Sequence, residues 1–386
     1  MTPVIVAGGG IGGLAAALGL ARAGRPVVVL ERSGEFRELG AGIQLGPNAF
    51  RALTRLGVGE LPYDCAVFIE ELRVMDAVGG GPLARLSLGE TFRRRFGAPY
   101  AVVHRGELHR ALLDTCREAG VVLRPGCAVE RYEQDDTGVR VFLAGGEHLD
   151  GAALVGADGL HSAVRRQLAG DGPPVVSGHV TYRSLIPADR MPAALRLPAA
   201  VLWAGPRCHL VHYPLVGGAY YNAVITRDSG ATEAVAGEPV GDAEVAREFA
   251  AVCGDARSLV EAGGDWRRWV LCDRPPLRDW QDGRVVLLGD AAHPMLQYAA
   301  QGACMALEDA ACLSDHVGGA SADPTEAFAR YVADRRERTA RVQTVSRRLG
   351  KELYHPQGQA AEARDAMITA LDEAALHHEM SWLYEH

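Results

Sequence analysis

Residues 3–31 read PVIVAGGGIGGLAAALGLARAGRPVVVLE, and this stretch decides the fold. The apolar run over residues 3–7 predicts a short buried strand. A glycine-rich turn follows, and residues 14–22 predict a helix rich in alanine and leucine. Residues 25–30 predict a second apolar strand, which ends at Glu31. The order strand, helix, strand is a βαβ unit, so the sequence predicts an α/β fold.

The turn of this unit carries the pattern Gly8-x-Gly10-x-x-Gly13. Gly8 permits a tight turn, Gly10 lets the backbone approach a pyrophosphate, and Gly13 lets the helix pack closely on the strand. Glu31 can accept hydrogen bonds from a ribose diol. A purely structural glycine turn is the alternative, but the flanking strand, helix and acid favour a dinucleotide, either NAD or FAD.

A second informative stretch runs from Val285 to Leu307. Its first four residues predict a buried strand that stops at Gly289-Asp290-Ala291-Ala292-His293-Pro294. This places a carboxylate at the carboxyl end of a strand, where ligands bind in open α/β sheets. After a turn the chain passes Gly302 and enters an apolar-periodic helix, whose free N–H groups would face an anion or a carbonyl. We interpret the stretch as holding a flavin's ribityl chain and ring oxygens.

Composition narrows the class of protein. The chain has 386 residues, enough for two domains or one with an insertion, and 48% of them are hydrophobic, which argues against disorder. The net charge of −8 argues against nucleic acid as the main partner. The eight cysteines include no CxxC, so neither disulfides nor a metal site is expected, and a reducing, cytoplasmic compartment fits best. No apolar run of about 18 residues predicts a membrane span.

Three further segments carry candidate ligand contacts. Residues 40–48 (GAGIQLGPN) predict a second glycine-rich loop before a helix. Arg105 opens another predicted helix. Residues 121–151 alternate like a small antiparallel meander, and the apolar run 152–157 ends in Asp158-Gly159. Taken alone, Arg105 is explained equally well as a solvated arginine and Asp158 as a turn residue.

Together, the Gly8 to Gly13 turn, the segment GADGLHSAVR at 156–165 and the segment GDAAHP at 289–294 resemble the three fingerprints of single-component FAD-dependent aromatic hydroxylases. The resemblance covers nearly the whole chain. It implies a Rossmann-type FAD-binding domain (GR2-like) interrupted by a β-sheet substrate domain, a helical C-terminus, and no second fold for NAD(P)H. In that group the Asp-Gly motif is associated with FAD and pyridine nucleotide, and the Gly-Asp aspartate contacts the ribityl chain.

The expected boundaries follow from these motifs. The FAD-binding domain takes residues 1–174, including the meander, and returns at 273–350. The substrate domain takes 175–272, and 351–386 form a C-terminal helical segment. The residues expected to bind tightly but non-covalently held FAD are Gly8, Gly10, Gly13, Glu31, Arg32, Arg105, Asp158, Asp290, Pro294, Gly302 and Ala303.

In the expected substrate domain, residues 179–186, 200–203, 208–214 and 219–225 predict strands and 243–252 a helix. Within 208–214, the period of two places His209 and Tyr213 on one face and His212 on the other. The pair His209 and Tyr213 resembles a pair lining the active site in the 3-hydroxybenzoate 6-hydroxylase and 6-hydroxynicotinate 3-monooxygenase branches. A histidine bonded to a backbone carbonyl is the alternative for His209, and the expectation for His212.

The resemblance implies insertion of one atom of O2 into a phenolic ring through a flavin C4a-hydroperoxide, with NADH or NADPH supplying electrons. His209, with an ordinary pKa of about 6.5, is expected to accept the hydroxyl proton. Tyr213 would relay that proton or orient the ring, and Gln297 would bond the hydroxyl or the peroxide. Gln44 and Arg183 complete the expected substrate site, with Arg183 binding a carboxylate. A loop amide explains Gln297, and a structural ion pair Arg183, equally well.

The expected substrate is a monocyclic phenolic acid, with 6-hydroxylation of 3-hydroxybenzoate to gentisate favoured. Salicylate or hydroxynicotinate hydroxylation, and a flavin oxidase, dehydrogenase or reductase, remain alternatives, as does a non-catalytic flavin-binding protein. Residues 325–350 and 360–383 predict helices, the first with arginines expected on a solvated face. The C-terminal tail resembles the 3-hydroxybenzoate 6-hydroxylase branch but lacks an expected Arg-Asn pair. A homodimer is usual in such relatives.

Overall fold

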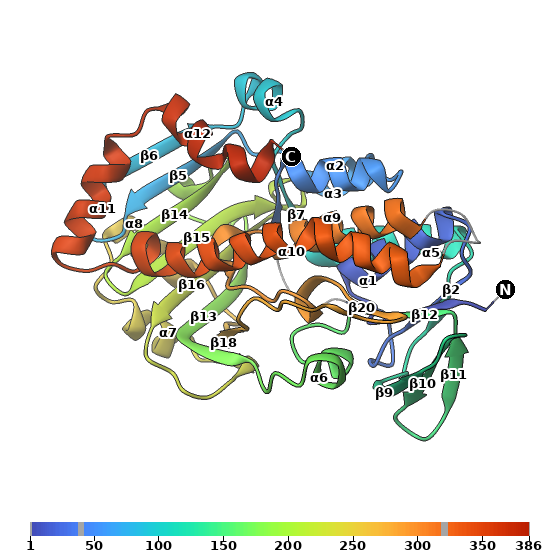
Figure 1. Ribbon diagram of the computed structural model, residues 1–386. Coiled ribbons are helices and arrows are strands. Elements are labelled where there is room, and N and C mark those ends of the chain that lie inside the picture. Colours follow the sequence, from blue (N-terminus) through green and yellow to red (C-terminus); the bar gives the residue numbers. More distant parts are fainter. Residues whose placement is uncertain (1, 38–41, 318–322, 386) are drawn as a thin grey trace.

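The computed structural model describes residues 2–37, 42–317 and 323–385. Within these ranges, no helix has the length and apolar character needed to cross a membrane. The chain forms two main layers that meet at a shared cavity (Figure 1). One layer is a mostly parallel sheet with helices packed against it, and the other is a larger, mostly antiparallel sheet.

The predicted βαβ unit is present. Strand β1 (Val4–Ala7) leads into α1 (Ile11–Arg22), and β2 (Val27–Leu30) returns parallel to β1. The glycines permit close packing: a Cβ on Gly13 would lie 2.0 Å from the carbonyl oxygen of Gly8, and Gly8 itself has φ +110°. Helix α1 therefore begins directly on the turn that ends β1.

The parallel sheet has the order β19-β20-β12-β1-β2-β8. All neighbours run parallel except β19 and β20. The stretch that begins at Val285 thus enters the sheet as β20, and one strand, β12, separates it from β1. Because the carboxyl ends of parallel strands share one edge, the segment after β20 lies beside the glycine turn after β1. The remaining strands are β8 (Val122–Arg124), β12 (Ala153–Gly156), β19 (Gln281–Asp282) and β20 (Val285–Leu287).

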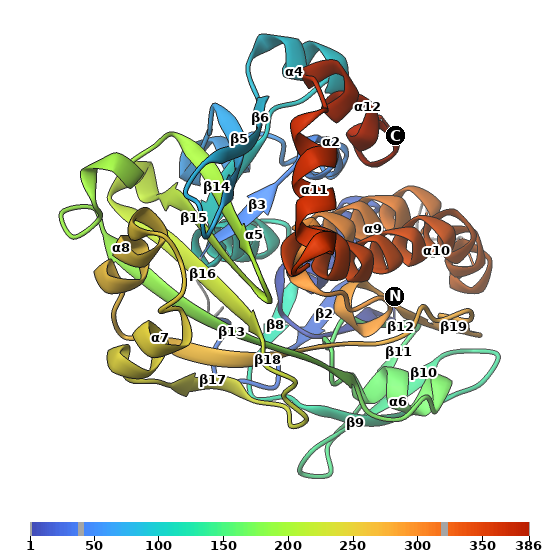
Figure 2. The ribbon, with the colours of Figure 1, turned by 90° about the vertical axis from the view of Figure 1, so that its left-hand side faces the viewer.

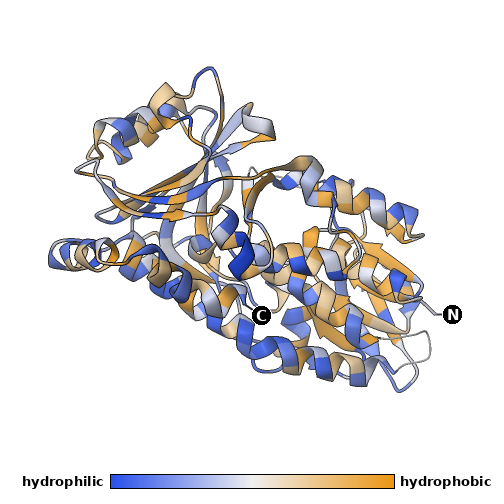
Figure 3. Cartoon of the chain, turned by 90° about the horizontal axis from the view of Figure 1, so that it is seen from above, coloured by the Kyte–Doolittle hydropathy of each residue, from blue (hydrophilic) through white to orange (hydrophobic). Residues whose placement is uncertain are grey.

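Five helices pack around this sheet and build the core. Helix α1 packs against α5 (Arg105–Glu118) and α9 (Gly302–Val317), and α9 packs against α10 (Pro324–Leu349) and α2 (Pro47–Arg55). Apolar colour concentrates on the strands near the N-terminus, while the outward turns of the helices are polar (Figure 3). Helix α9 is thus enclosed, which places its first turn at the cavity and its middle in the core.

Smaller elements surround the parallel sheet. Strand β8 joins its edge, while β9, β10 and β11 form a three-stranded antiparallel meander. Strands β3, β7 and β4 form another small sheet. Residues 42–45 are therefore strand β3, which pairs with β7, and not part of the predicted loop; Gly40 and Ala41 fall outside the described residues. The bounds are β9 Val129–Gln134, β10 Val139–Leu143, β11 His148–Gly151, β3 Gly42–Leu45, β7 Ala101–His104, β4 Ala66–Val67, α3 Leu61–Cys65, α4 Glu90–Phe96 and α6 Ala163–Ala169.

The large sheet has eight strands in the order β17-β18-β13-β16-β15-β14-β5-β6. Strands β5 (Glu71–Asp76) and β6 (Pro82–Ser87) come from the first part of the chain, and β5 pairs parallel with β14. Helices α7 (Asp242–Glu248) and α8 (Gly254–Ala262) cover one face (Figure 2), and the other face looks into the cavity. The other strands are β13 Val175–Pro187, β14 Ala199–Gly205, β15 Cys208–Leu215, β16 Tyr220–Asp228, β17 Ala236–Pro239 and β18 Arg267–Asp273.

The C-terminal segment crosses from the first layer to the second. After α10 the chain makes a π-helical turn at Gly350–Tyr354 and continues in α11 (Gln359–Thr369) and α12 (Glu373–Tyr384). The predicted helix over 360–383 is thus two helices, because Asp372 caps a new start: its side chain accepts a hydrogen bond from the Ala375 N–H at 2.8 Å. Tyr384, the last residue of α12, packs against Phe92 and Phe96 of α4.

The close contact at the glycine turn is testable. Replacing Gly13 by Ala forces its methyl group onto backbone that cannot rotate away, so we expect a loss of about 1–3 kcal/mol in the free energy of unfolding. Replacing Gly254 by Ala is the matched control, since a Cβ there meets nothing within 4 Å. Chemical unfolding of both variants checks this, and equal stabilities would contradict the packing argument.

Candidate active site

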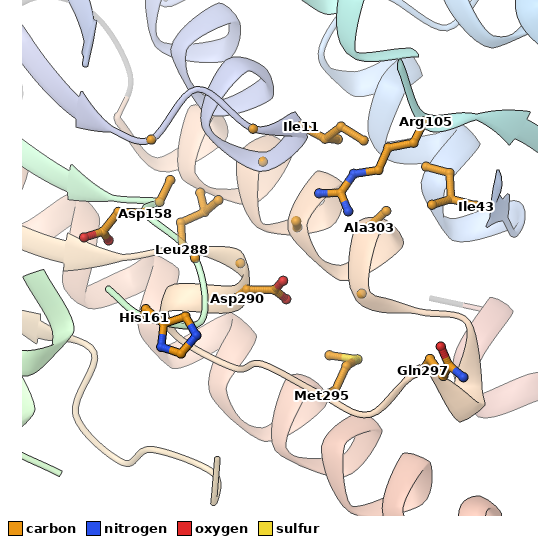
Figure 4. A pocket seen from close by; sticks show the side chains of 18 of the residues that line it. Ile11, Ile43, Arg105, Asp158, His161, Leu288, Asp290, Met295, Gln297 and Ala303 are labelled. Atoms are coloured by element: carbon orange, nitrogen blue, oxygen red, sulfur yellow. The ribbon is translucent and has the colours of Figure 1, made fainter. Parts of the chain in front are cut away.

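A cavity of about 760 Å³ lies between the two layers, at the carboxyl ends of β1, β12 and β20. Close-up, Asp290 and Arg105 extend toward its centre and Gln297 lies at one end (Figure 4). Most of the predicted site residues line it together: Gly8, Gly10, Glu31, Arg32, Gln44, Arg105, Asp158, Arg183, His209, Tyr213, Asp290, Gln297, Gly302 and Ala303.

Gly13 and Pro294 do not line the cavity. Gly13 acts one layer behind, where its missing side chain lets α1 meet the turn. Pro294 is buried, and its carbonyl oxygen accepts a hydrogen bond from Gln343 of α10 at 2.9 Å. Both shape the wall that other residues present.

At the amino-terminal side, Glu31 secures the glycine turn. One carboxylate oxygen accepts a hydrogen bond from the Gly9 N–H and the other from the Ser33 N–H, each at 2.8 Å. A carboxylate offers about four acceptor positions, so acceptor capacity remains for a ligand hydroxyl. The start of α1 has no side-chain cap and no acid in its first turn, which leaves its N–H groups directed at the cavity.

Asp158 has a different local role. Its carboxylate accepts hydrogen bonds from the Ser162 hydroxyl at 2.5 Å and from the Ala163 N–H at 2.7 Å, so it holds the start of α6. Burial raises the pKa of this carboxyl. Both oxygens are therefore already engaged by the chain, and Asp158 borders the cavity mainly through the turn that it stabilises.

Asp290 is exposed toward the cavity, and its carboxylate makes no hydrogen bond to any residue in the described ranges. It stands in a short turn, Gly289–Ala291, directly after β20. The first turn of α9 faces the same space: it holds no acid, and a Cβ on Gly302 would meet nothing within 4 Å. A carboxylate and a set of free N–H donors thus border one part of the cavity.

A buried carboxylate fixes this turn. Asp309 of α9 is fully buried, and one oxygen accepts hydrogen bonds from His293 Nε2 at 2.5 Å and from the Gly289 N–H at 3.1 Å. The other oxygen accepts from Arg335 Nε of α10 at 2.7 Å. Burial raises the pKa of Asp309, but the interactions with His293 and Arg335 outweigh it and lower the pKa to about 2.

The ion pairs extend to the neighbouring acid. Glu308 binds Arg335 at 2.5 Å and Arg338 at 2.7 Å, and also accepts from Asn48 Nδ2 at 2.6 Å. The prediction that the α10 arginines form a solvated face is therefore wrong for Arg335 and Arg338, which α9 draws inward. Sequence reasoning gave Glu308 and Asp309 no role, although two adjacent acids inside an apolar helix were a usable signal.

The far end of the cavity carries an unpaired cation. Arg183 of β13 is half-buried, forms no ion pair with a carboxylate in the described chain, and leaves its buried Nε without a hydrogen-bond partner, while its guanidinium lies 5.2 Å from the centroid of the Trp269 ring. Its Nη2 donates to Gln297 Oε1 at 3.2 Å. Burial lowers the pKa of Arg183, and an anion at this position would offset that cost. The structural ion pair weighed for Arg183 is absent here.

Gln297 and Gln44 are held by protein partners. The Gln297 amide donates to the hydroxyls of Thr226 at 3.0 Å and Thr181 at 3.2 Å, while its oxygen accepts from Arg183. This arrangement matches the satisfied-amide explanation and makes Gln297 a support for Arg183. Gln44 Oε1 accepts from the Tyr100 hydroxyl at 2.5 Å.

The period of two along β15 is confirmed. His209, Val211 and Tyr213 line the cavity, while Leu210 packs into the core beneath α7 and α8. Tyr213 lies against Gly42: a Cβ there would come within 2.4 Å of the tyrosine ring. Burial raises the pKa of Tyr213, so at neutral pH its hydroxyl stays protonated and can donate a hydrogen bond.

His209 has a partner that sequence reasoning missed. Its Nδ1 lies 2.7 Å from Nε2 of His355, a residue 146 positions away. Burial, followed by the nearby His355 and His179, lowers the pKa of His209 well below its usual value. The expectation of an ordinary pKa near 6.5 is therefore wrong, because the ring is 1% exposed. No sequence pattern relates these two positions.

One group outside the cavity has metal-ligand chemistry. Cys312, His316 and Asp334 each place one ligand atom within 4.8 Å of the others. His316 and Asp334 are already hydrogen-bonded at 2.6 Å, and burial raises the pKa of the Cys312 thiol to about 12. These contacts account for the cluster as an ordinary hydrogen bond beside a protonated thiol.

Comparison with known proteins assigns the chain to a family. The family model described as FAD binding domain matches residues 1–346. The chain belongs to this family. The 3-hydroxybenzoate 6-hydroxylase 1 of Aquipseudomonas alcaligenes is 48% identical over 99% of this chain and 97% of its own length. The 3-hydroxybenzoate 6-hydroxylase of Polaromonas naphthalenivorans is 45% identical over 99% and 95%.

Solved structures agree. Klebsiella pneumoniae HpxO, complexed with FAD and uric acid, superposes with a TM-score of 0.86 at 26% identity over 98% of this chain and 95% of that one. A salicylate hydroxylase substrate complex gives 0.84 at 25% identity over 100% and 95%. The protein is an FAD-dependent aromatic-ring monooxygenase, and the predicted fold class and cofactor are confirmed.

The residues of the cavity fit FAD. Two uncovered helix starts supply N–H donors, which suit a pyrophosphate and ring carbonyls. Glu31 and Asp290 retain acceptor capacity for hydroxyl groups. Arg32 and Arg105 add positive charge to a site whose ligand is anionic. The volume of the cavity and its extension to the eight-stranded sheet leave a second compartment beside the flavin site.

The Asp309 contacts predict a pH-dependent stability. Replacing Asp309 by Asn breaks a buried charge pair, so we expect a loss of about 3–5 kcal/mol near neutral pH. The folded-state pKa near 2 lies below the unfolded value of about 3.9, so the contribution of Asp309 is full above pH 4 and disappears as the pH falls toward 2.

Urea unfolding of wild type and D309N at several pH values measures this difference. The matched control is Glu326→Gln, which removes an acid from an exposed ion pair of α10 and should cost less than about 1 kcal/mol. A difference between wild type and D309N that stays constant down to pH 2 would contradict the assignment.

Proposed function

We propose that the protein hydroxylates a small phenolic carboxylic acid, with conversion of 3-hydroxybenzoate to gentisate the best-supported reaction. O2 and NADH or NADPH are its co-substrates. The support is twofold: relatives at 43–48% identity are named 3-hydroxybenzoate 6-hydroxylases, and the second compartment has the chemistry for such an acid.

The observation that carries the proposal is Arg183. Its buried Nε has no hydrogen-bond partner and its guanidinium has no anionic partner among the described residues, which is costly, and Arg183 lies on the same sheet face as His209 and Tyr213. A substrate carboxylate would supply the missing charge through a forked pair of hydrogen bonds. The aromatic ring that carries this carboxylate then presents its hydroxyl group to the polar side chains of β15. The free carboxylate and the free hydroxyl thus each find a partner of matching chemistry.

For the cofactor, we propose that the glycine turn and the start of α1 bind the pyrophosphate and that Glu31 binds a ribose. Asp290 binds the ribityl chain, and the start of α9 with Gly302 and Ala303 binds the ring carbonyls. The two FAD-binding parts are residues 1–174 and 273–350. The substrate domain is 175–272, to which β5 and β6 add two strands, followed by a helical segment at 351–386.

Bound FAD, once reduced, supplies the activation of O2 and the electrophilic oxygen atom. The chain's own residues do the rest. Arg183 fixes the substrate's orientation, Tyr213 donates a hydrogen bond, and His209 accepts the hydroxyl proton, which makes the ring a stronger nucleophile. The enclosing sheets limit access of water to the reacting atoms. The homodimer suggested by the resemblance stays a prediction.

The cofactor assignment predicts a separation of binding from folding. Replacing Asp290 by Ala removes an exposed carboxylate without hydrogen bonds to the described chain, so stability should change by less than about 0.5 kcal/mol. The affinity for FAD should fall roughly tenfold or more, the value of one or two lost hydrogen bonds. Fluorescence titration of apoprotein with FAD measures the affinity. Asp282→Ala, at an exposed acid of β19, is the control; unchanged FAD affinity in D290A would reject the assignment.

The substrate assignment is tested with a panel of phenolic acids. Holoenzyme is mixed with 3-hydroxybenzoate, salicylate or 6-hydroxynicotinate, and NADH consumption, O2 consumption and aromatic products are followed together. We expect gentisate from 3-hydroxybenzoate in step with NADH oxidation. Hydroxylation of another acid alone would replace the substrate, and H2O2 without hydroxylated product would support the oxidase alternative.

Arg183→Gln should raise KM for the preferred acid about ten- to hundredfold, because one charge-assisted interaction is worth roughly 1.5–3 kcal/mol. The corresponding phenol without a carboxylate should lose little. Arg267→Gln is the matched control, since Arg267 is the exposed cross-strand neighbour of Arg183. Equal losses for the acid and the phenol would show that Arg183 does not bind the carboxylate.

A further inference from the structure

Two imidazole rings meet behind the substrate compartment. His209 of β15 lines the cavity, and its Nδ1 lies 2.7 Å from His355 Nε2. The rings are stacked at 5.0 Å with an interplanar angle of 30°. His355 follows directly after the π-helical turn Gly350–Tyr354, so the C-terminal segment reaches the active site at this point. Since Nδ1 of His209 is engaged, Nε2 is the ring nitrogen left for a ligand.

The surroundings of the pair are aromatic, and both rings are buried. The ring of His209 packs edge-on against Tyr354 at 4.7 Å and Tyr298 at 5.5 Å. His355 packs against His179, whose Nδ1 bonds the Tyr298 hydroxyl at 2.5 Å. Among the described residues, the carboxylate that acts on this group is Asp228 of β16, which favours the charged forms of His179 and His355.

This environment restricts the charge that either ring can carry. Burial lowers the pKa of His209 well below normal, and it lowers that of His355 to about 3. Both rings are therefore neutral at pH 7, and the hydrogen bond between them requires that one of the two facing nitrogens, Nδ1 of His209 or Nε2 of His355, carries a proton. The position of that proton decides whether His209 Nε2 is an acceptor or a donor toward the substrate.

We propose that His355 is the positioning residue for His209: it fixes the tautomer in which His209 Nε2 accepts, and it takes the proton that arrives from the substrate. The proposal rests on the proposed function, because it concerns the hydroxyl of a phenolic substrate. The transferred species is a proton, and it passes along two hydrogen bonds, from the substrate hydroxyl to His209 and from His209 to His355.

The step balances without any further reagent. The substrate O–H bond breaks and an N–H bond forms at His209 Nε2, while the Nδ1–H bond of His209 breaks and an N–H bond forms at His355 Nε2. His209 ends neutral, in its other tautomer. The products are a phenolate and an imidazolium at His355, so the buried site gains no net charge. Placing the cation on the second ring moves it toward Asp228 and away from the reacting oxygen.

Two substitutions separate orientation from proton uptake. In His355→Gln, the amide oxygen can still accept from His209 Nδ1–H and hold the right tautomer, but it cannot take a proton. In His355→Ala, both functions are lost. We expect each variant to lower kcat at pH 7 by about a hundredfold or more, the lower range of general base catalysis, with the affinity for FAD unchanged.

The pH profile gives the readout that a structural role would not move. A phenol ionises in solution with a pKa near 10, so kcat/KM of both variants should rise with pH as free phenolate becomes available, while wild type stays nearly flat. A ring-fluorinated substrate with a more acidic hydroxyl should lose less. Added imidazole should restore His355→Ala, whose side-chain volume is vacant, and leave His355→Gln unchanged.

His212→Gln is the matched control, because it removes a buried imidazole from the opposite face of the same strand. It should lower stability but leave the pH profile as in wild type. Wild-type kcat and pH profile in His355→Gln would overturn the proton uptake, and so would failure of imidazole to rescue a folded, FAD-loaded His355→Ala. Failure of the wild type to hydroxylate any phenolic acid would instead overturn the proposed function, and the relay with it.

Discussion

The site depends on one buried carboxylate. Asp309 joins the turn after β20 to helix α10, with Gly289 and His293 bound on one oxygen and Arg335 on the other. Hydrogen bonding within the sheet positions β20, while Asp309, together with Arg165, which donates to the carbonyls of Ala291 and Ala292, fixes how the following turn leaves the sheet. The direction of Asp290 and the position of the α9 start both follow from that turn. A charge held in this way is stable only while its partners stay in place, so the flavin wall and the packing of α9 on α10 form one cooperative unit.

The two compartments meet opposite electrostatic demands. In the flavin compartment the protein supplies N–H groups and carboxylates, most of them near solvent or tied to local backbone. In the substrate compartment it supplies a half-buried guanidinium, one tyrosine hydroxyl and a neutral imidazole. Such a set is poorly satisfied alone and well satisfied by a phenolic acid. Some favourable interactions of these groups thus form only when a ligand of matching charge binds, which favours specificity over stability.

Short-range patterns predicted the parts of this molecule whose reasons are local. The glycine turn follows from close approach of Gly13 to Gly8, and the orientation of His209 and Tyr213 follows from the two-residue period of a strand. The sequence could not show that β5 and β6 join the large sheet, that Arg335 turns inward, or that the Glu31 carboxylate holds Gly9. Each of these depends on which distant segment lies alongside. The prediction of an ordinary pKa for His209 was wrong for the same reason, because burial is a property of the whole fold.

The lowered pKa of His209 shows that two requirements of the proposed reaction oppose each other. Shielding a reactive oxygen donor requires a dry compartment, but a dry compartment lowers the basicity of the histidine that must accept the substrate proton. A more exposed histidine would be a better base in a worse position. The structure instead places a second ring behind the buried ring, and the carboxylate of Asp228, at the end of β16, acts on the second ring. Basicity then belongs to the chain of groups, and the C-terminal segment that carries His355 becomes part of the active site although it contributes nothing to the flavin-binding sheet.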